Sequence, residues 1–524
     1  MGSCEQTIFN DIKEACSPQG KLLYAGHLLQ RANHLYPSST ALISSHRTLS
    51  YKNLFFRSLL FSKRLASAGV KKGDNVVIFY ENTPEFFVAY FGIWQLGAVC
   101  VPVNTFLHER ELAYIINDAQ PTVIVASPTL RTVVDNAFQQ GLTQHHTAIM
   151  SADDFDWQTP EPDIIDAALT SLVEQNVDQE SLCALLYTSG TTGTPKGVML
   201  SSRNIMTNAM QGYARFTLFG MRQQERFFCV LPLFHVFAQN ACLWLPTIIG
   251  AAVILVQKID RKLILEGLSH KPTLFFGVPP LYGLLCLMRT APLQSVKIFV
   301  SGADMLPDKI RAAFGIIYGR KICAGYGLSE ASPVVAVDHE NRLAATCVVG
   351  KPLVGITCQI RDDEGKSLPP NTTGNLWIKG DNVMMGYYHA PESTAAILQD
   401  GWLNTGDLAS VDLHSNLAIR GRTKDIIIHK GFNIYPAEVE NILMMHPAVF
   451  KAAVVGQDED MGGQVPVAFV AIKQDAENVE EALRNLCIRN LAAYKVPRRI
   501  VCLNDLPMNA TGKIDKKRLT MPRI

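Results

Sequence analysis

The first 420 residues alternate short runs of β-branched and aromatic residues with stretches of helix length, and this alternation constrains the fold more than any other feature. Residues 76–80 (VVIFY) precede the stretch 84–97, and residues 122–126 (TVIVA) follow the amphipathic stretch 109–119. Strands that alternate with helices indicate βαβ units, so the pattern predicts an α/β fold with a parallel sheet covered by helices. Further buried strands are predicted at 182–187, 273–278 and 296–302.

The pattern changes twice toward the C-terminus. Near residue 350 the strands become shorter and alternate in polarity, and residues 357–380 predict a β-hairpin or small barrel element that turns around residues 363–373. After the basic segment 421–424 the chain has its own series of strand and helix patterns, over about 100 residues, which is enough for an independent domain. We therefore expect an N-terminal domain of residues 1–421 and a C-terminal domain of residues 422–524.

One stretch, residues 227–256, contains no Lys, Arg, Asp or Glu and is long enough to span a bilayer. Pro232, Pro246 and Gly250 divide it into a strand-like start, a helix-length middle and a strand-like end. These interruptions of the apolar stretch favour a buried α/β core over a transmembrane helix. Peripheral contact with the inner face of a membrane is a weaker expectation from the same stretch.

Composition excludes several classes of protein. The chain has 48% hydrophobic and 18% charged residues, which is typical of a globular protein and not of a disordered one. Its formal net charge of +1 provides no overall field for nucleic acid, so we expect no nucleic-acid partner. The 12 cysteines form no Cys-x-x-Cys pair and no secretory segment opens the chain, which predicts free thiols in a cytoplasmic protein.

A loop rich in glycine and hydroxyl groups, residues 187–198 (YTSGTTGTPKGV), directly follows the predicted strand 182–187. Its glycines allow the backbone to approach anionic oxygens, its hydroxyls are donors, and Lys196 supplies a positive charge, so the loop predicts a polyphosphate site. It is not a Walker A loop, because Lys196 is preceded by Pro195 and followed by Gly197.

Four further segments carry residues that suit a nucleotide site. Tyr326 lies between two glycines and can offer its ring to a base, and Glu330 can bind the magnesium that accompanies ATP. Asp407 follows a glycine and can accept from ribose hydroxyls. Arg422 precedes a predicted strand, and Lys513 follows a glycine on a terminal loop. Taken singly, such charged residues are usually solvated surface groups.

Six segments resemble, in the same order along the chain, the core motifs of the adenylate-forming superfamily. They are YTSGTTGTPKGV, LPLFHVFA, GYGLSEASP, GWLNTGDLA, GRTKDIIIHKGFNIYPAEVE and LPMNATGK. This superfamily includes acyl-CoA synthetases, aryl-CoA ligases, luciferases and peptide-synthetase adenylation domains. The resemblance covers nearly the whole chain and is strongest to the fatty acyl-CoA synthetase branch. It implies a large N-terminal domain of two sheet and helix lobes plus a small β-barrel, and a smaller mobile C-terminal α/β lid.

The resemblance also implies a reaction in two steps. A medium- to long-chain fatty acid and MgATP give acyl-AMP and pyrophosphate, and the thiol of coenzyme A then displaces AMP. A carboxylate has no good leaving group, whereas the acyl-AMP anhydride releases a phosphate monoester. Dividing the reaction into two steps therefore replaces one difficult step by two easier ones.

Site residues are carried over from the resemblance by position. Lys513, Glu330, His235 and Lys196 are the expected catalytic residues, and Thr188 and Glu330 the expected magnesium contacts. The residues expected to contact ATP are Thr188, Ser189, Gly190, Thr191, Thr192, Gly193, Thr194, Lys196, Gly325, Tyr326, Gly327, Ser329, Asp407, Arg422, Lys424 and Lys513. The residues expected to line the acyl pocket are Phe234, His235, Phe237, Gly277, Val278, Ser301, Gly302 and Ala303.

Lys424 matches the hinge of the family, where rotation would bring Gly431 and Asn433 toward the coenzyme A side. Two positions depart from the family pattern. Ser329 stands where Thr is usual, and Ile428 stands where many relatives have Lys, which removes one possible phosphate contact of the lid.

The sequence leaves alternatives open. The acyl acceptor could be the pantetheine of an acyl carrier protein instead of coenzyme A, and the acid could be another carboxylic acid. Luciferase-like oxidation, an enzyme that stops at acyl-AMP, and a non-catalytic binder of nucleotide or fatty acid are further alternatives. Chain length of the acid and oligomeric state are not readable from any motif.

Overall fold

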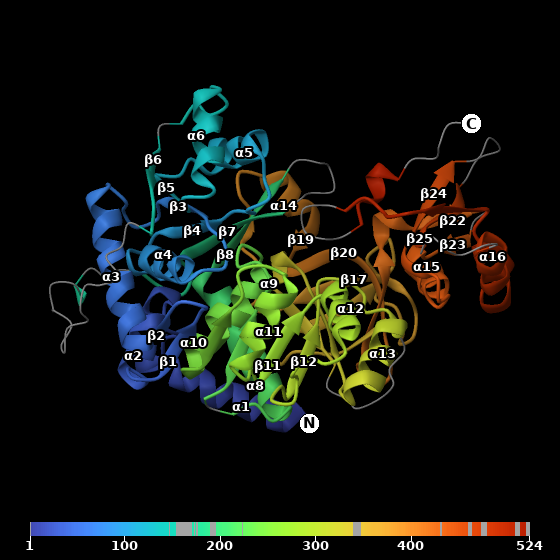
Figure 1. Ribbon diagram of the computed structural model, residues 1–524, viewed down its shortest axis with the longest axis horizontal. Coiled ribbons are helices and arrows are strands. Elements are labelled where there is room, and N and C mark those ends of the chain that lie inside the picture. The colour runs from blue at the N-terminus through green and yellow to red at the C-terminus, as the bar shows by residue number, and fades with distance from the viewer. Residues whose placement is uncertain are drawn as a thin grey trace.

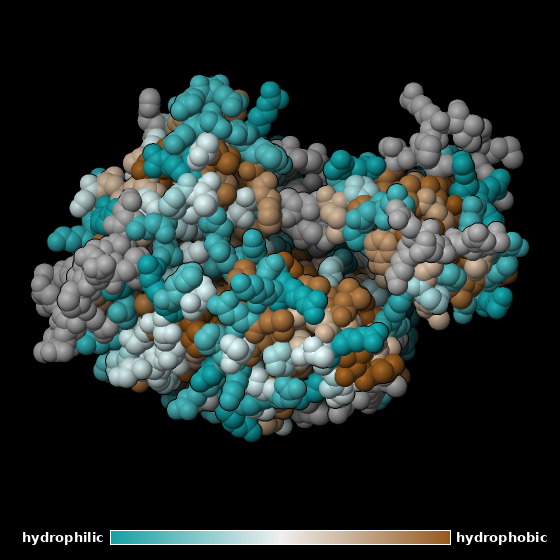
Figure 2. Space-filling view, in the orientation of Figure 1, coloured by the Kyte–Doolittle hydropathy of each residue, from teal (hydrophilic) through white to brown (hydrophobic). Residues whose placement is uncertain are grey.

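The computed structural model describes residues 2–145, 147–153, 170–171, 173, 177–188, 195–222, 224–338, 347–429, 432–458, 464–472, 479–508 and 514–519. The chain forms a large N-terminal domain and a smaller C-terminal domain, which lies at one end of the molecule (Figure 1). The space-filling view shows the smaller domain beside the larger one, with a hollow in the outline between them (Figure 2).

The first lobe contains a seven-stranded sheet of mixed direction. Its central strands are parallel because each is connected to the next through a helix, as the alternating sequence pattern predicts. Helix α4 (Pro84–Gln95) is buried along its whole length, and α5 (Glu109–Ala119) buries one face. The strand order is β18 (Gly386–Tyr387), β8 (Lys196–Ser201), β7 (Leu182–Thr188), β4 (Val99–Pro102), β3 (Asn75–Phe79), β5 (Val123–Ala126), β6 (Ala148–Met150).

The second lobe is built on a 14-stranded sheet. Six neighbouring strands are parallel: β13 (Cys323–Gly327), β12 (Ile298–Ser301), β11 (Leu274–Gly277), β9 (Arg226–Cys229), β10 (Ala252–Leu255) and β1 (Thr40–Ile43). At one end β2 (Thr48–Ser50) pairs with β1 in the antiparallel direction. Helices α8 (Ser202–Leu218), α11 (Arg261–Ser269), α12 (Pro279–Met288) and α13 (Asp308–Tyr318) pack on this lobe.

Beyond β13 the same sheet continues in antiparallel pairs, and this part corresponds to the expected small barrel element. The predicted hairpin is confirmed, since β16 and β17 pair on either side of residues 362–373. The strands are β14 (Val334–Val337), β15 (Val348–Pro352), β21 (Leu417–Arg422), β20 (Trp402–Val411), β17 (Gly374–Lys379) and β16 (Thr357–Arg361).

The uncharged stretch 227–256 is interior, as predicted. It forms β9, a helical middle that contains a π-helical turn (Asn240–Trp244), and β10, and most of its side chains are buried. Its burial removes the reason for expecting membrane contact through this stretch. Among the described residues, no helix has the length and apolar character needed to cross a membrane.

All 12 cysteines are free thiols, as predicted.

The C-terminal domain has a hydrophobic core of its own, which includes Ile427, Leu443 and Ala468. Helix α15 (Pro436–Met444) packs against β24 (Val449–Asp458), which pairs with β25 (Gln464–Ile472), and β26 (Arg499–Leu503) completes this sheet. The remaining elements are the pair β22 (Ile427–His429) and β23 (Phe432–Ile434), and α16 (Val479–Asn490).

The Lys309 ammonium of α13 donates to the carbonyl oxygen of Val449 at 3.0 Å, which joins the two domains. The boundary at residues 421 and 422 stays a prediction.

Candidate active site

The predicted site residues of the second lobe lie at one edge of its sheet. Tyr326 is the last but one residue of β13, Ser301 ends β12, Gly277 ends β11, and His235 follows β9. These strands are parallel neighbours, so their carboxyl ends meet at the same edge, which is where open α/β sheets bind ligands.

Tyr326, Asp407 and Arg422 form one hydrogen-bonded group, which we call the Asp407 cluster. The pairing of β20 with β21 sets Asp407 opposite Arg422, and the Arg422 Nε lies 2.7 Å from Asp407 Oδ1. The Tyr326 hydroxyl donates to Asp407 Oδ2 at 2.5 Å. Burial, together with the Asp407 carboxylate, raises the pKa of Tyr326 well above its ordinary value, so the hydroxyl remains a donor.

The Asp407 carboxylate is 4% exposed and is fixed by these two donors. Its backbone N–H donates to the Thr405 hydroxyl at 3.1 Å, across Gly406 in the middle of β20. An ionised carboxylate is an acceptor with about four acceptor positions, so a carboxylate held in this manner can accept from hydroxyl donors. The cluster therefore presents a rigid acceptor beside an aromatic ring, a combination that suits a nucleoside.

Lys196, Glu330 and Tyr387 form a second group, the Glu330 cluster. Glu330 lies in a short 3₁₀ turn (Ser329–Ala331), and its Oε1 accepts from the Tyr387 hydroxyl at 2.8 Å. The Lys196 ammonium lies 5.2 Å from the centre of the Tyr387 ring and donates to Ser393 Oγ at 3.0 Å. Burial and the Glu330 charge raise the pKa of Tyr387, which keeps it a donor to the carboxylate. A fixed carboxylate near a lysine suits a polyphosphate with its magnesium ion.

Sequence reasoning missed Tyr387, which lies outside the six motifs that carry the family resemblance. It also missed a set of buried amides that holds the backbone around Glu330. The Asn208 amide of α8 donates to the Val334 carbonyl at 2.7 Å, and the Asn240 amide donates to the Ser332 carbonyl at 3.1 Å. Because Asn240 also donates to Asn208 at 2.9 Å, the two amides act as one support.

The predicted acyl residues lie together at the ends of β9, β11 and β12. His235 begins helix α9 (Val236–Gln239), and its Nδ1 accepts from the Phe237 backbone N–H at 3.2 Å. The Phe237 ring packs on Gly302, where an added Cβ would lie 3.1 Å from the ring carbons. A larger residue at position 302 would therefore push the Phe237 ring away by a few tenths of an ångström. Phe234 makes an edge contact with Phe106, which is 62% exposed.

The remaining acyl positions surround this group. Val278 begins helix α12, Gly277 packs against Leu281 and Tyr282, and Ala303 has a positive φ of 68°. The Ser301 hydroxyl is buried and has no hydrogen-bond partner in the structure. An unsatisfied buried hydroxyl at the edge of the sheet is a candidate donor to a polar group of the substrate.

Several predicted residues fall outside the described part of the chain. These are Ser189, Gly190, Thr191, Thr192, Gly193, Thr194, Gly431 and Lys513. The two ends of the phosphate loop are described: Thr188 ends β7 and is paired with Lys196, which begins β8. Asn433 lies in β23, opposite Ile428, which is 54% exposed. Gly325 and Gly327 flank Tyr326 in β13, Ser329 begins the turn of Glu330, and Lys424 lies in a 3₁₀ turn (Thr423–Asp425) after β21.

Two family descriptions match the chain. The description of AMP-binding enzymes matches residues 29–388, and that of the AMP-binding enzyme C-terminal domain matches residues 438–513. The first match alone covers more than half of the chain. The chain therefore belongs to the adenylate-forming superfamily of AMP-binding enzymes.

The relatives define this assignment more narrowly. A long-chain-fatty-acid–CoA ligase of Bacillus subtilis (strain 168) is 32% identical, with 97% of this chain and 96% of the relative covered. The 4-coumarate–CoA ligase 1 of Petroselinum crispum is 31% identical, with 90% and 88% covered. These similarities support an AMP-forming acid:CoA ligase activity, whereas the acid differs between the relatives.

Solved structures agree with the fold. The anthranilate CoA ligase AuaEII in complex with anthranoyl-AMP has a TM-score of 0.86 at 28% identity, over 94% of this chain and 96% of that one. The O-succinylbenzoate coenzyme A synthetase MenE from Bacillus subtilis, in complex with ATP and a magnesium ion, has a TM-score of 0.82 at 28% identity, over 94% and 99%. The expected fold class, with a large N-terminal and a smaller C-terminal α/β domain, is confirmed.

Proposed function

We propose that this protein activates a medium- to long-chain fatty acid with ATP and transfers the acyl group to coenzyme A. The observation that carries the proposal is that the segment 326–330 contributes to both clusters. Tyr326 belongs to the Asp407 cluster, and Glu330, four residues further along the chain, belongs to the Glu330 cluster. A nucleoside acceptor and a phosphate site are thus joined at the edge of the sheet where the acyl residues lie.

Each cluster has a separate role in this proposal. Asp407 accepts from the ribose hydroxyls, Arg422 assists there, and Tyr326 lies against adenine. Lys196 and the loop 188–196 hold the β- and γ-phosphates, with Thr188 and Glu330 as magnesium contacts. Magnesium, when bound with ATP, neutralises charge on the phosphates. Because attack falls on the α-phosphate, Lys196 holds the pyrophosphate leaving group and does not present a γ-phosphate for transfer.

The reacting centre is assigned to residues from both domains. Lys513 reaches the carboxylate and α-phosphate, where negative charge develops, and His235 borders the carboxylate end of the acyl pocket. The lid, with its boundary at residues 421 and 422, turns at Lys424 between the two steps. Gly431 and Asn433 then approach the coenzyme A side.

The apolar character of the acyl region supports a fatty acid as the substrate. Phe234, Phe237 and Val278 offer aromatic and aliphatic surface, and the described residues there include no Lys or Arg that would pair with a second carboxylate of the substrate. A long-chain-fatty-acid–CoA ligase is also among the relatives.

A pyrophosphate-release screen tests the substrate. With ATP, Mg²⁺ and coenzyme A, we expect saturable release with medium- and long-chain fatty acids and little with acetate, benzoate or succinate. Activity confined to acetate or an aromatic acid would leave the ligase chemistry intact and refute the fatty-acid assignment. No release with any acid would favour the non-catalytic binder. Replacing coenzyme A with holo-acyl carrier protein identifies the acceptor.

The support of Glu330 by buried amides leads to a second test. An Asn208→Ala variant removes the donor to the Val334 carbonyl, the acceptor of the Val334 N–H and one of the two acceptors of the Asn240 amide, which costs about 1–3 kcal/mol of unfolding free energy. We expect a several-fold rise in KM for MgATP with little change in KM for the acid, measured with urea unfolding on the same preparation. Thr217→Val, at the other end of α8, is the control. A purely structural role would reduce active protein and leave both KM values unchanged.

A further inference from the structure

Helix α5 contacts the chain at both ends of the phosphate loop. Its residues Tyr114 and Asp118 are four positions apart, so they lie one turn from each other on the same side of the helix. The Asp118 carboxylate accepts from the Tyr187 hydroxyl at 2.5 Å. The Tyr114 hydroxyl donates to the Pro195 carbonyl at 3.1 Å. One turn of a single helix therefore holds the chain where it enters the loop and where it leaves it.

These two contacts lie next to residues that the proposed function assigns to ATP. Tyr187 directly precedes Thr188, the proposed magnesium contact. Pro195 directly precedes Lys196, the proposed contact of the pyrophosphate. The pairing of β7 with β8 sets Thr188 opposite Lys196, so a shift at one end of the loop is passed to the other. The position of both side chains thus depends on their attachment to α5.

The contact between Tyr187 and Asp118 is the stronger of the two. Burial, together with the Asp118 carboxylate, raises the pKa of Tyr187, so its hydroxyl remains a donor. A hydrogen bond to a charged acceptor is stronger than one to a neutral carbonyl. On its other oxygen, Asp118 faces the His389 ring, whose Nδ1 lies 3.6 Å away. The Tyr114 side chain is 37% exposed, so water competes for its hydroxyl and weakens its contact.

Side-chain packing alone does not fix the end of the loop at Lys196. A cavity of about 170 Å³ is lined by Tyr114 and Asp118 of α5 and by residues 195–197 and 388–390. A cavity removes packing contacts from the groups that line it. The hydrogen bonds from α5 therefore have a larger share in holding Lys196 than they would in a filled interior.

We propose that Tyr114 and Asp118 are positioning residues for the adenylation step. They act through the two ends of the phosphate loop and keep the magnesium contact and the pyrophosphate contact in fixed positions relative to each other. The inference rests on the proposed function and adds to it two residues outside the six family motifs. Because the second step has no pyrophosphate to hold, we expect both residues to affect the first step alone.

Asp118→Ala and Tyr114→Phe remove the two contacts separately. We expect Asp118→Ala to weaken MgATP binding about 3- to 10-fold, because part of the loss of a hydrogen bond to a charged group reaches the loop. Tyr114→Phe should weaken it about twofold, since its bond is exposed and neutral. Binding of AMP, which has no β- or γ-phosphate, should stay unchanged in both. Calorimetry without the acid measures both ligands. Pyrophosphate release should slow, whereas conversion of supplied acyl-AMP with coenzyme A should keep the wild-type rate.

Three further variants complete the test. Asp118→Asn keeps an oxygen that can accept from Tyr187, so it should recover most of the affinity for MgATP. Tyr187→Phe removes the same bond without leaving a buried hydroxyl unpaired, and it should reproduce the pattern of Asp118→Ala even where that variant is unstable.

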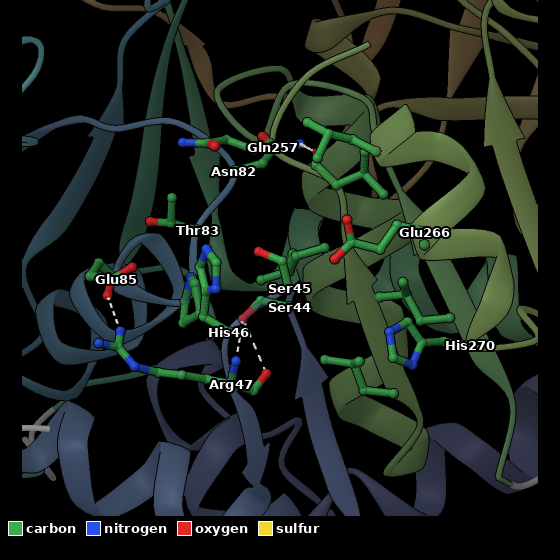
Figure 3. A pocket seen from close by; sticks show the side chains of 17 residues that line it. Ser44, Ser45, His46, Arg47, Asn82, Thr83, Glu85, Gln257, Glu266 and His270 are labelled. Carbon is green, nitrogen blue, oxygen red and sulfur yellow. Dashed lines mark hydrogen bonds and ion pairs between the residues drawn. The ribbon is translucent and has the colours of Figure 1, made fainter. Parts of the chain in front are cut away.

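Ser44→Ala is the matched control for Tyr114→Phe, because it also deletes a hydroxyl that donates to the backbone. The Ser44 hydroxyl donates to the Arg47 carbonyl at 3.1 Å, beside a separate cavity of about 300 Å³ (Figure 3). None of the described residues assigned to ATP or to the acid lines that cavity. The affinity of Ser44→Ala for MgATP should match the wild type.

The outcomes separate this inference from the proposed function. Unchanged MgATP binding in Asp118→Ala and Tyr187→Phe would overturn the inference. An equal loss of MgATP and AMP binding, or of the two half-reactions, would also overturn it, because it would indicate a general effect on the fold. If the wild-type protein releases no pyrophosphate with any acid, the ligase function fails, and the comparison of MgATP with AMP binding still decides whether α5 positions the phosphate loop.

Discussion

A Lys513→Ala variant is expected to lose acyl-AMP formation by about 10²- to 10³-fold, the usual cost of removing one fixed donor from a site of developing negative charge. Thioester formation from supplied acyl-AMP should be largely retained, because the proposed turn of the lid between the two steps moves Lys513 away from the reacting centre. Pyrophosphate release measures the first step, and conversion of synthetic acyl-AMP with coenzyme A measures the second.

Lys516→Ala is the matched control for Lys513. It removes a positive charge three residues further along the same segment, where the ammonium pairs with Glu440 at 2.6 Å within the C-terminal domain. We expect this variant to form acyl-AMP at close to the wild-type rate. An equal loss of both half-reactions in Lys513→Ala would contradict the assignment of Lys513 to the lid.

The second large effect is expected for Asp407→Asn. The substitution keeps the shape of the side chain and removes the charge that both Tyr326 and Arg422 use. A hydrogen bond to a charged group is worth about 1.5–3 kcal/mol. KM for MgATP should therefore rise about 10- to 100-fold, at 1.4 kcal/mol for each factor of ten. Initial-rate kinetics with ATP as the varied substrate measure the change.

Asp400→Asn provides the comparison for Asp407→Asn. Asp400 lies just before β20 and is exposed, so the same change of charge is made in the same hairpin without touching the Asp407 cluster. Its KM for MgATP should match the wild type. A rise of similar size in both variants would mean that surface charge, and not contact with the ribose, determines nucleotide affinity.

The strands and helices were largely predictable from the sequence, because the core strands are short apolar runs bounded by turn residues. The predicted strand 182–187 is β7, and 273–278 contains β11. The order of the strands was not predictable. Leu42 of β1 pairs with Val253 of β10 across more than 200 residues of chain, and this pairing is decided by tertiary packing that no local pattern reports.

The candidate site was predictable where residues belong to a motif. Tyr326, Asp407 and Arg422 come from three separate motifs, and the structure brings them together. The support of the site was not predictable from the residue types. Asn208 and Asn240 are polar residues within helices, which usually face solvent, and here they are buried and bonded to each other.

The position of Arg422 has a consequence for the order of events. Arg422 is the last residue of β21 and is held by Asp407, whereas Lys424 follows two residues later. In the proposed function the lid turns at Lys424, so Arg422, although it is the first residue of the predicted lid, lies before the hinge and keeps its contact with Asp407. The nucleoside can then remain bound while the lid exchanges one set of groups for another, and pyrophosphate departs between the two steps.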